Sequence, residues 1–262
     1  MSSLVVRSAG SVGRFVGEML SQFGRITMLV GRTGAVSIKR PLRFGDTAYQ
    51  LLRDGARSLP LALTMSAFAG MVLAFQFGHG LERFGAKMFI AQTTVTALFR
   101  ELGPVLTALV VGGRIGAGIT AELGGMAVSD QIDAVRALGA DPIRRLVLPR
   151  IAAVVIALPL LTICGDLVGA AGGMLIAGVQ YGISPALYVQ GVVDFVTVGD
   201  FASGIIKSLV FGLVIGAVAC NFGIRTRGGT EGVGQSTTKA VVWSALLVLF
   251  GDLLLTKALL TL

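Results

Sequence analysis

Five long apolar stretches divide the chain. They cover about residues 58–78, 91–125, 146–178, 201–222 and 241–260, and polar segments separate them. About 20 apolar residues in a helix cross the hydrocarbon core of a bilayer. The pattern therefore predicts an all-α integral membrane protein with five transmembrane helices.

The first forty-five residues have a different pattern, in which apolar and polar side chains fall on opposite faces of a helix. Phe15, Met19 and Ile26 share one face, whereas Arg14 and Arg25 lie on the other. This favours an interfacial amphipathic helix with its arginines toward anionic headgroups. A solvated helix packed on its own protein is the alternative.

No internal repeat or linker interrupts residues 1–262, so we expect a single domain. Its parts are an interfacial region, 1–45, and a transmembrane bundle, 46–262.

The polar segment after the second apolar stretch predicts a short, capped helix over 129–139. Ser129 and Asp130 are candidate N-cap residues, and Asp133 follows Asp130 as in a variant capping box. Gly139 is suited to the C′ position, and Asp141-Pro142 would begin the next helix.

Along this short helix, Ile132, Val135 and Leu138 recur every three residues and share one side. An apolar stripe on a short helix in a polar loop indicates that something outside the bilayer receives it. Of the other connections, 182–199 contains a second short amphipathic helix, and 223–240 reads as a polar loop.

Composition agrees with a membrane protein, because 54% of residues are hydrophobic and only 14% charged, against about 25% charged in soluble domains. The net charge of +8 does not indicate a nucleic-acid partner, since the basic residues follow a topology pattern. Sixteen lie in 1–57, 123–150 and 223–239, and two lie in 79–90 and 182–199. The positive-inside rule then places the N-terminus in the cytoplasm and the C-terminus outside.

Charged residues inside apolar stretches need a reason, because a lone charge in the bilayer is costly. Arg100 and Glu101 either contact a lipid headgroup or are hydrogen-bonded within the bundle. Asp166 and Asp252 favour helix-to-helix hydrogen bonds, but a carboxylate relay would instead make the chain a proton-coupled secondary carrier. Lys207 is expected near an outer helix end, where its amine can reach the interface.

Catalytic chemistry is not indicated. The sequence has no GxxxxGK[ST] phosphate loop and no GxSxG motif, and one histidine with two isolated cysteines predicts no metal site. Cys164 and Cys220 lie in apolar stretches and read as buried apolar residues. We therefore expect neither an enzyme nor a bound cofactor.

Glycines at four-residue spacing predict close helix packing, because small residues let helix backbones approach in lipid. The pattern does not separate packing within a subunit from packing between two. The positions are Gly112 and Gly116, Gly165, Gly169 and Gly173, and Gly212 and Gly216.

Three long motifs carry a family resemblance: ELGPVLTALVVGGRIGAGITAELGGM, SDQIDAVRALGADPIRRLVLPR and GGTEGVGQSTTKAVV. They resemble the MlaE (YrbE) family, the permease subunits of ABC transporters of the lipid-transporting Mla system. The resemblance extends over nearly the whole chain past residue 45.

The resemblance implies a homodimeric permease of the bacterial inner membrane that carries phospholipid or a related lipid. A separate cytoplasmic ATPase (MlaF-like) would bind the ATP, a hexameric MCE-domain protein (MlaD-like) would sit on the periplasmic side, and a STAS-domain protein (MlaB-like) would accompany the ATPase. Arg100 and Glu101 correspond to a polar pair near the lipid pocket. The short helix corresponds to the coupling helix, which would meet the ATPase through Asp130, Ile132, Asp133, Val135, Arg136 and Leu138.

Overall fold

The computed structural model describes the backbone of residues 2–39 and 44–261, and the side chains from residue 17 onward except 18, 38–43, 260 and 262. The protein is 92% helical, and no strand occurs in the described ranges. The α-helices are α1 Ser2–Lys39, α2 Phe44–Gln50, α3 Leu59–Glu82, α4 Ile90–Ala97, α5 Gly103–Leu106, α6 Gly113–Val128, α7 Gln131–Ala137, α8 Leu148–Tyr181, α9 Pro185–Phe195, α10 Val198–Ile224 and α11 Gly229–Leu260. Wider π-helical turns lie at Leu51–Gly55, Leu98–Leu102, Thr107–Gly112 and Ile143–Val147.

Five helical segments are long and apolar enough to cross a membrane: Phe44–Glu82, Lys87–Val128, Ile143–Tyr181, Val198–Ile224 and Gly229–Leu259. The predicted all-α fold with five transmembrane helices is therefore confirmed. Each segment is longer than its apolar stretch, because the helices continue into polar sequence where backbone hydrogen bonds need no apolar side chains.

The predicted polar loop over 223–240 is wrong for most of its length, since α11 begins at Gly229. The turn is made at Gly228 and Gly229, whose φ angles of 90° and 66° suit glycine. The polar residues that follow have no helix-breaking proline, so they form a helix.

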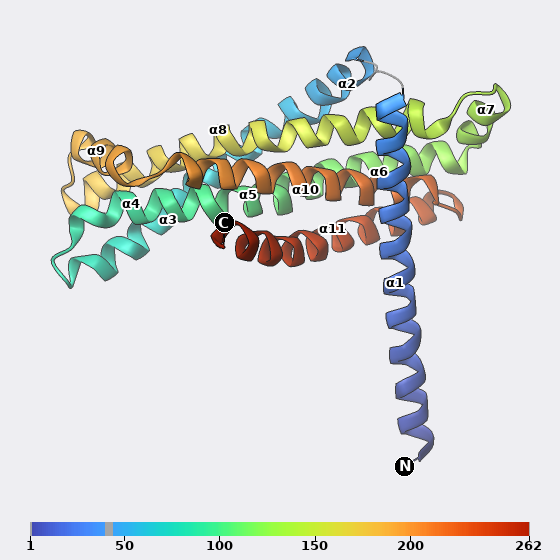
Figure 1. The fold of residues 1–262 in the computed structure, drawn as a ribbon, viewed down its shortest axis with the longest axis horizontal. Coiled ribbons are helices and arrows are strands. Elements are labelled where there is room, and N and C mark those ends of the chain that lie inside the picture. The colour runs from blue at the N-terminus through green and yellow to red at the C-terminus, as the bar shows by residue number, and fades with distance from the viewer. Residues whose placement is uncertain (1, 40–43, 262) are drawn as a thin grey trace.

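α10 lies between α8 and α11 in the bundle (Figure 1). α3 packs along one side of α8 and α10 along another, and α10 in turn contacts α6 and α11. α7 lies at one end of the bundle and α9 at the opposite end, and we refer to these as the α7 end and the α9 end (Figure 1).

The spaced glycines lie where helices approach each other within this chain. Gly165 and Gly169 face Ser66 of α3, and Gly173 faces Thr94 of α4 and Tyr188 of α9. On the other side, Gly112 and Gly116 face Ile215, Gly212 faces the backbone of Val154 and Val155, and Gly216 faces Ile151. These contacts bring α8 close to both α3 and α10.

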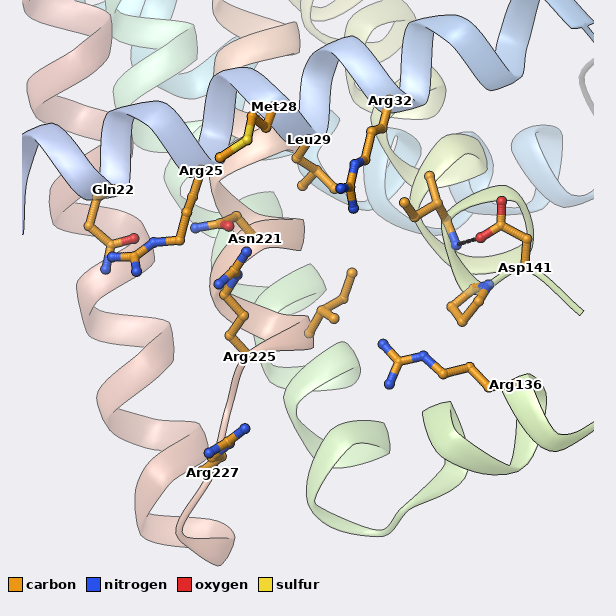
Figure 2. A pocket seen from close by; sticks show the side chains of 13 residues that line it. Gln22, Arg25, Met28, Leu29, Arg32, Arg136, Asp141, Asn221, Arg225 and Arg227 are labelled. Atoms are coloured by element: carbon orange, nitrogen blue, oxygen red, sulfur yellow. Dashed lines mark hydrogen bonds between the residues drawn. The ribbon is translucent and has the colours of Figure 1, made fainter.

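α1 runs across the bundle, roughly perpendicular to the membrane-spanning helices, and its N-terminal half extends beyond them (Figure 1). Ile26 is buried, and Leu29 and Val30 pack against the core. Polar and apolar residues of α1, including Arg25 and Leu29, border a pocket at the α7 end (Figure 2). This orientation fits a helix in the membrane plane, although the predicted face residues Phe15 and Arg14 lie outside the described side chains.

α9 is the predicted short amphipathic helix in the 182–199 connection. Ser184 begins it as N-cap, and its hydroxyl accepts a 3.3 Å hydrogen bond from the Leu187 amide. Tyr188 is buried against the bundle, and burial raises the pKa of its hydroxyl above the ordinary value.

One cysteine differs from its predicted environment. Cys220 is buried in α10 as expected, but Cys164 is exposed on α8. Cys164 lies next to Gly165, which faces α3, so the neighbouring position on the helix turns outward. In a membrane-spanning helix an outward apolar residue need not be buried by protein.

Candidate functional site

The short helix α7 begins differently from the prediction. Asp130 is its N-cap, but with a left-handed backbone (φ 55°) and no side-chain cap hydrogen bond. Asp133 instead forms a 2.7 Å ion pair with Arg136, and the Ser129 hydroxyl donates to the Gly125 carbonyl of α6. The predicted capping box is therefore wrong, because the sharp turn between α6 and α7 occupies both candidate caps.

The end of α7 follows the prediction. Gly139 has φ 74°, and its amide donates to the Arg136 carbonyl at 2.9 Å, while the Ala140 amide donates to the Val135 carbonyl. This is the Schellman arrangement that glycine favours. The Asp141 carboxylate then accepts a 2.9 Å bond from the Ile143 amide and so starts the next helix.

The apolar stripe of α7 does not form one exposed surface. Ile132 is 4% exposed and belongs to the chain's own core, Val135 is half-buried, and Leu138 is 83% exposed. The expectation that all three face a partner must therefore be revised, since Ile132 anchors α7 to the bundle. Asp130, Asp133, Arg136 and Leu138 remain on the outer surface.

In the half of the bundle nearer α9, a set of charged residues connects three helical segments. The π-helical turn Leu98–Leu102 carries Arg100 and Glu101, and it precedes Pro104. Proline has no N–H to bond the carbonyl four residues earlier, which is that of Arg100. The missing bond accounts for a widened turn here, and π-turns are frequent at functional sites.

Arg100 and Glu101 point to different partners on α10. Arg100 lies 3.3 Å from the Asp200 carboxylate, and Glu101 contacts the Lys207 ammonium. Lys207 also lies 3.0 Å from the Asp252 carboxylate and donates to the Thr256 hydroxyl at 2.7 Å, both on α11. Ion pairs thus connect the π-turn, α10 and α11.

Lys207 contradicts its predicted position, because it has no exposed surface. Two carboxylates and a hydroxyl surround its ammonium, which offsets the cost of removing it from water. The role of Lys207 was missed because spacing along one helix does not reveal which residues of another helix it meets. The signal was present as a single lysine within an apolar stretch.

Asp166 on α8 lies apart from these ion pairs. It is buried, its Oδ1 has no hydrogen-bond partner in the described part of the chain, and that oxygen sits against Gly103. Among the described residues no contact links it to Asp252, which is paired with Lys207. The sequence favoured helix-to-helix hydrogen bonds for both aspartates, with a carboxylate relay as the alternative. Asp252 contacts another helix through its ion pair, whereas the Asp166 Oδ1 has no such partner among the described residues.

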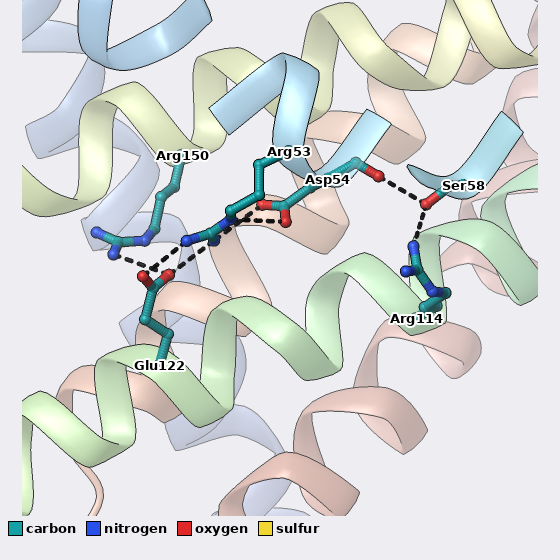
Figure 3. Close-up of polar contacts among 6 residues, drawn as sticks. All are labelled: Arg53, Asp54, Ser58, Arg114, Glu122 and Arg150. Atoms are coloured by element: carbon teal, nitrogen blue, oxygen red, sulfur yellow. Dashed lines mark hydrogen bonds and ion pairs between the residues drawn. The ribbon is translucent and has the colours of Figure 1, made fainter. Parts of the chain in front are cut away.

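A second ionic cluster lies toward the α7 end (Figure 3). The Glu122 carboxylate of α6 accepts two 2.9 Å hydrogen bonds from Arg53, and it lies 3.0 Å from Arg150 of α8. Nearby, Arg114 donates to the Ser58 hydroxyl at 2.5 Å. Sequence reasoning did not predict this cluster, which joins the start of the first span to the second and third.

The bundle thus combines five segments long enough to cross a membrane, a short helix at one end and charged residues set among apolar helices. The match to a known family is direct, since the family model described as "Permease MlaE" covers residues 47–258. The chain therefore belongs to the MlaE permease family.

Relatives extend over most of the chain. A probable ABC transporter permease protein of Rickettsia bellii is 36% identical over 97% of this chain and 98% of its own length. One from Synechocystis is 40% identical over 80% of each chain. Protein TRIGALACTOSYLDIACYLGLYCEROL 1, chloroplastic, of Arabidopsis thaliana is 39% identical over 88% of this chain and 66% of its own.

These relationships define the protein as a multi-pass permease subunit of the ABC transporter class. In that class the permease is the non-catalytic component, and an ATPase partner is implied.

Proposed function

We propose that this permease carries phospholipid or a related lipid between the inner membrane and an outer-side MCE-domain protein. The observation that carries the proposal is the Arg100–Asp200 and Glu101–Lys207 pairing within an apolar bundle. Arg100 and Glu101 keep 32% and 38% of their side-chain surface exposed. Charges of both signs beside apolar helix surfaces match a lipid, which has a charged headgroup and apolar tails.

The power source in this proposal is a separate cytoplasmic ATPase that docks on α7. Leu138, Asp133 and Arg136 are exposed there, and Ile132 ties the helix to the core. A force on Leu138 would therefore reach the core of the bundle through Ile132, and α6 contacts α7 directly. ATP binds to that partner, so the permease itself needs no cofactor.

The remaining assembly is proposed from the family. Two permeases would form a homodimer in the bacterial inner membrane, with the N-terminus cytoplasmic and the C-terminus periplasmic. An MCE-domain hexamer would lie at the α9 end, and a STAS-domain protein would accompany the ATPase. The Arabidopsis relative is named after a glycolipid, which supports a lipid substrate in this proposal.

The docking step is tested by co-purification of the permease with the ATPase encoded beside it. Leu138→Asp should abolish recovery of the ATPase while the permease still inserts. Val193→Asp is the matched control, because Val193 is also an exposed apolar residue but lies on α9 at the opposite end. Full ATPase recovery with Leu138→Asp would contradict the coupling role of α7.

The lipid is tested by placing a photo-cross-linkable residue at position 100 or 101 of the purified transporter. We expect a lipid adduct whose yield changes when ATP is added. The control position is Leu253, an exposed residue of α11 that should collect bulk lipid independently of ATP. Absence of adducts at both positions, or the same ATP response at Leu253, would count against the pocket.

A proton-coupled carrier is the second candidate, and buried Asp166 is the observation that favours it. Lipid movement that persists without the ATPase, collapses with the proton gradient and is lost in Asp166→Asn would establish it. Movement that requires the ATPase and survives Asp166→Asn would exclude it.

A further inference from the structure

A pocket of about 780 Å³ opens at the α7 end, between α1, α7 and the last turn of α10. Figure 2 shows side chains from these three helices reaching into the same space. Its volume lies within the ~300–1,000 Å³ range of small-molecule sites. Five arginines line it: Arg25, Arg32, Arg136, Arg225 and Arg227.

The positive charge of this pocket is largely unbalanced. Among the described lining residues Asp141 is the one acid, and its carboxylate already accepts a bond from the Ile143 amide. Arg136 is paired with Asp133 outside the lining. Among the described side chains the other four arginines make no ion pair. Arginines held together without counter-charges repel one another, so an anion would lower the free energy of this region.

Two hydrogen-bond donors in the pocket wall are buried and unsatisfied. Asn221 of α10 is 3% exposed, and its Nδ2 has no acceptor in the described part of the chain. The Nε of Arg25 is likewise buried without an acceptor. Buried donors nearly always have partners, and an orphan costs the desolvation free energy of the group. An oxygen-rich anion in the pocket would accept from both.

The pocket also has features that a bare inorganic anion would not use. Met28 and Leu29 of α1 form an apolar part of the lining. The Oε1 of Gln22 is buried and has no donor among the described side chains. A lipid headgroup offers phosphate oxygens to the arginines and hydroxyl or ammonium donors to Gln22. α1 crosses the spans roughly at right angles (Figure 1). A helix in the membrane plane would do so, and a pocket beside such a helix would lie at headgroup depth.

We propose that this pocket binds the phosphate group of an anionic phospholipid headgroup. The site is distinct from the Arg100 and Glu101 region, which lies in the other half of the bundle. An occupant would contact α1, α7 and α10 together, and would thereby hold the interfacial helix against α7. The proposal stands independently of which lipid the transporter carries.

The test is a titration of the purified full chain with phosphatidylglycerol, with bound lipid counted by native mass spectrometry. Asn221→Leu is the decisive variant, because it removes a donor without changing charge and also removes a buried orphan group. We expect it to weaken binding about tenfold, as for loss of one hydrogen bond to a charged group. Arg225→Gln should weaken binding at least as much.

The matched control is Arg145→Gln, which removes an exposed arginine at the same end but outside the lining. We expect less than about a fivefold effect, the size of one surface charge near a membrane. Unfolding of each variant without lipid is measured in parallel, and Asn221→Leu should unfold no earlier than the unchanged protein. If Asn221→Leu binds lipid normally and Arg225→Gln matches Arg145→Gln, the lipid attraction is general and the proposal is overturned.

A second arm separates the sources of the phosphate. Inorganic phosphate should compete with the lipid in the unchanged protein and compete less in Arg225→Gln. Binding of inorganic phosphate without any retained phosphatidylglycerol would overturn the lipid assignment in favour of a soluble phosphate compound. Loss of ATPase co-purification in Asn221→Leu with unchanged lipid binding would overturn it in favour of a protein partner.

Discussion

Lys207 of α10 holds its ammonium against the carboxylate of Glu101, which comes from the π-helical turn before Pro104. Lys207 has no exposed surface, and its second carboxylate partner is Asp252 of α11, at 3.0 Å. The pairing fixes the π-turn relative to α10 and α11, which is the part of the bundle where we propose that lipid binds.

Replacing Lys207 with methionine should destabilise the fold strongly. The substitution leaves Glu101 and Asp252 near each other without a cation, and breaking a buried pair this way costs about 3–5 kcal/mol. The apparent Tm of the purified protein in detergent measures the effect. The triple variant Lys207→Met, Glu101→Gln, Asp252→Asn should recover most of the loss, because no uncompensated charge remains. Equal Tm values for the single and triple variants would contradict this account.

Glu122→Gln should destabilise the packing of the spans at the α7 end. The Glu122 carboxylate accepts hydrogen bonds from Arg53 and lies beside Arg150, so its loss leaves Arg53 with Asp54 alone and takes from Arg150 its carboxylate partner (Figure 3). We expect a cost of about 1.5–3 kcal/mol, as for hydrogen bonds to charged groups. Glu82→Gln is the control, since Glu82 pairs with Lys87 on the surface, where an ion pair contributes about 0–1 kcal/mol. The stability of each variant is measured as its Tm in detergent. A similar decrease in Tm for both variants would contradict the prediction.

Two glycines of α3 should respond in opposite directions to alanine. A Cβ at Gly70 would overlap the carbonyl oxygen of Gly169 on α8, whereas a Cβ at Gly80 would meet nothing within 4 Å. Gly70→Ala should therefore cost about 1–3 kcal/mol as overpacking. Gly80→Ala should stabilise by about 0.5–1 kcal/mol, because glycine is the poorer helix former. If Gly70→Ala unfolds at the same Tm as Gly80→Ala, α3 and α8 are not in this close contact.

The five spans were predictable because a bilayer imposes a length and an apolar composition on each helix. Both properties can be recognised in a single segment of the sequence, without knowledge of its neighbours. The Schellman end at Gly139 was predictable for the same reason, since its bonds join neighbouring residues. The start of α7 was not, because whether Asp130 caps depends on how sharply α6 turns. The backbone of Asp130 is left-handed, and no local sequence pattern predicts that conformation.

The charged residues show the same division. Sequence identified Arg100 and Glu101 as unusual, since a charge in an apolar stretch is visible in isolation. It did not identify Asp200 or Lys207 as their partners, because those contacts depend on how α10 packs against the π-turn. The lysine expected at the interface is instead buried between two acids, an arrangement that only the three-dimensional packing creates.

The orientation of the bundle gives the last prediction. From the distribution of basic residues along the chain we predict that the α7 end lies in the cytoplasm, and the proposed ATPase can bind only if it does. Single-cysteine variants test this once Cys164 and Cys220 are replaced by serine and alanine. Leu138→Cys on α7 and Val193→Cys on α9 both replace exposed residues, so each should react readily with a membrane-impermeant maleimide from its own side. In intact cells permeabilised only at the outer membrane, Val193→Cys should be labelled and Leu138→Cys should not. In inverted inner-membrane vesicles the order should reverse. Labelling of Leu138→Cys from outside would place α7 on the side of the membrane opposite the cytoplasmic ATPase. That result would contradict the proposed coupling.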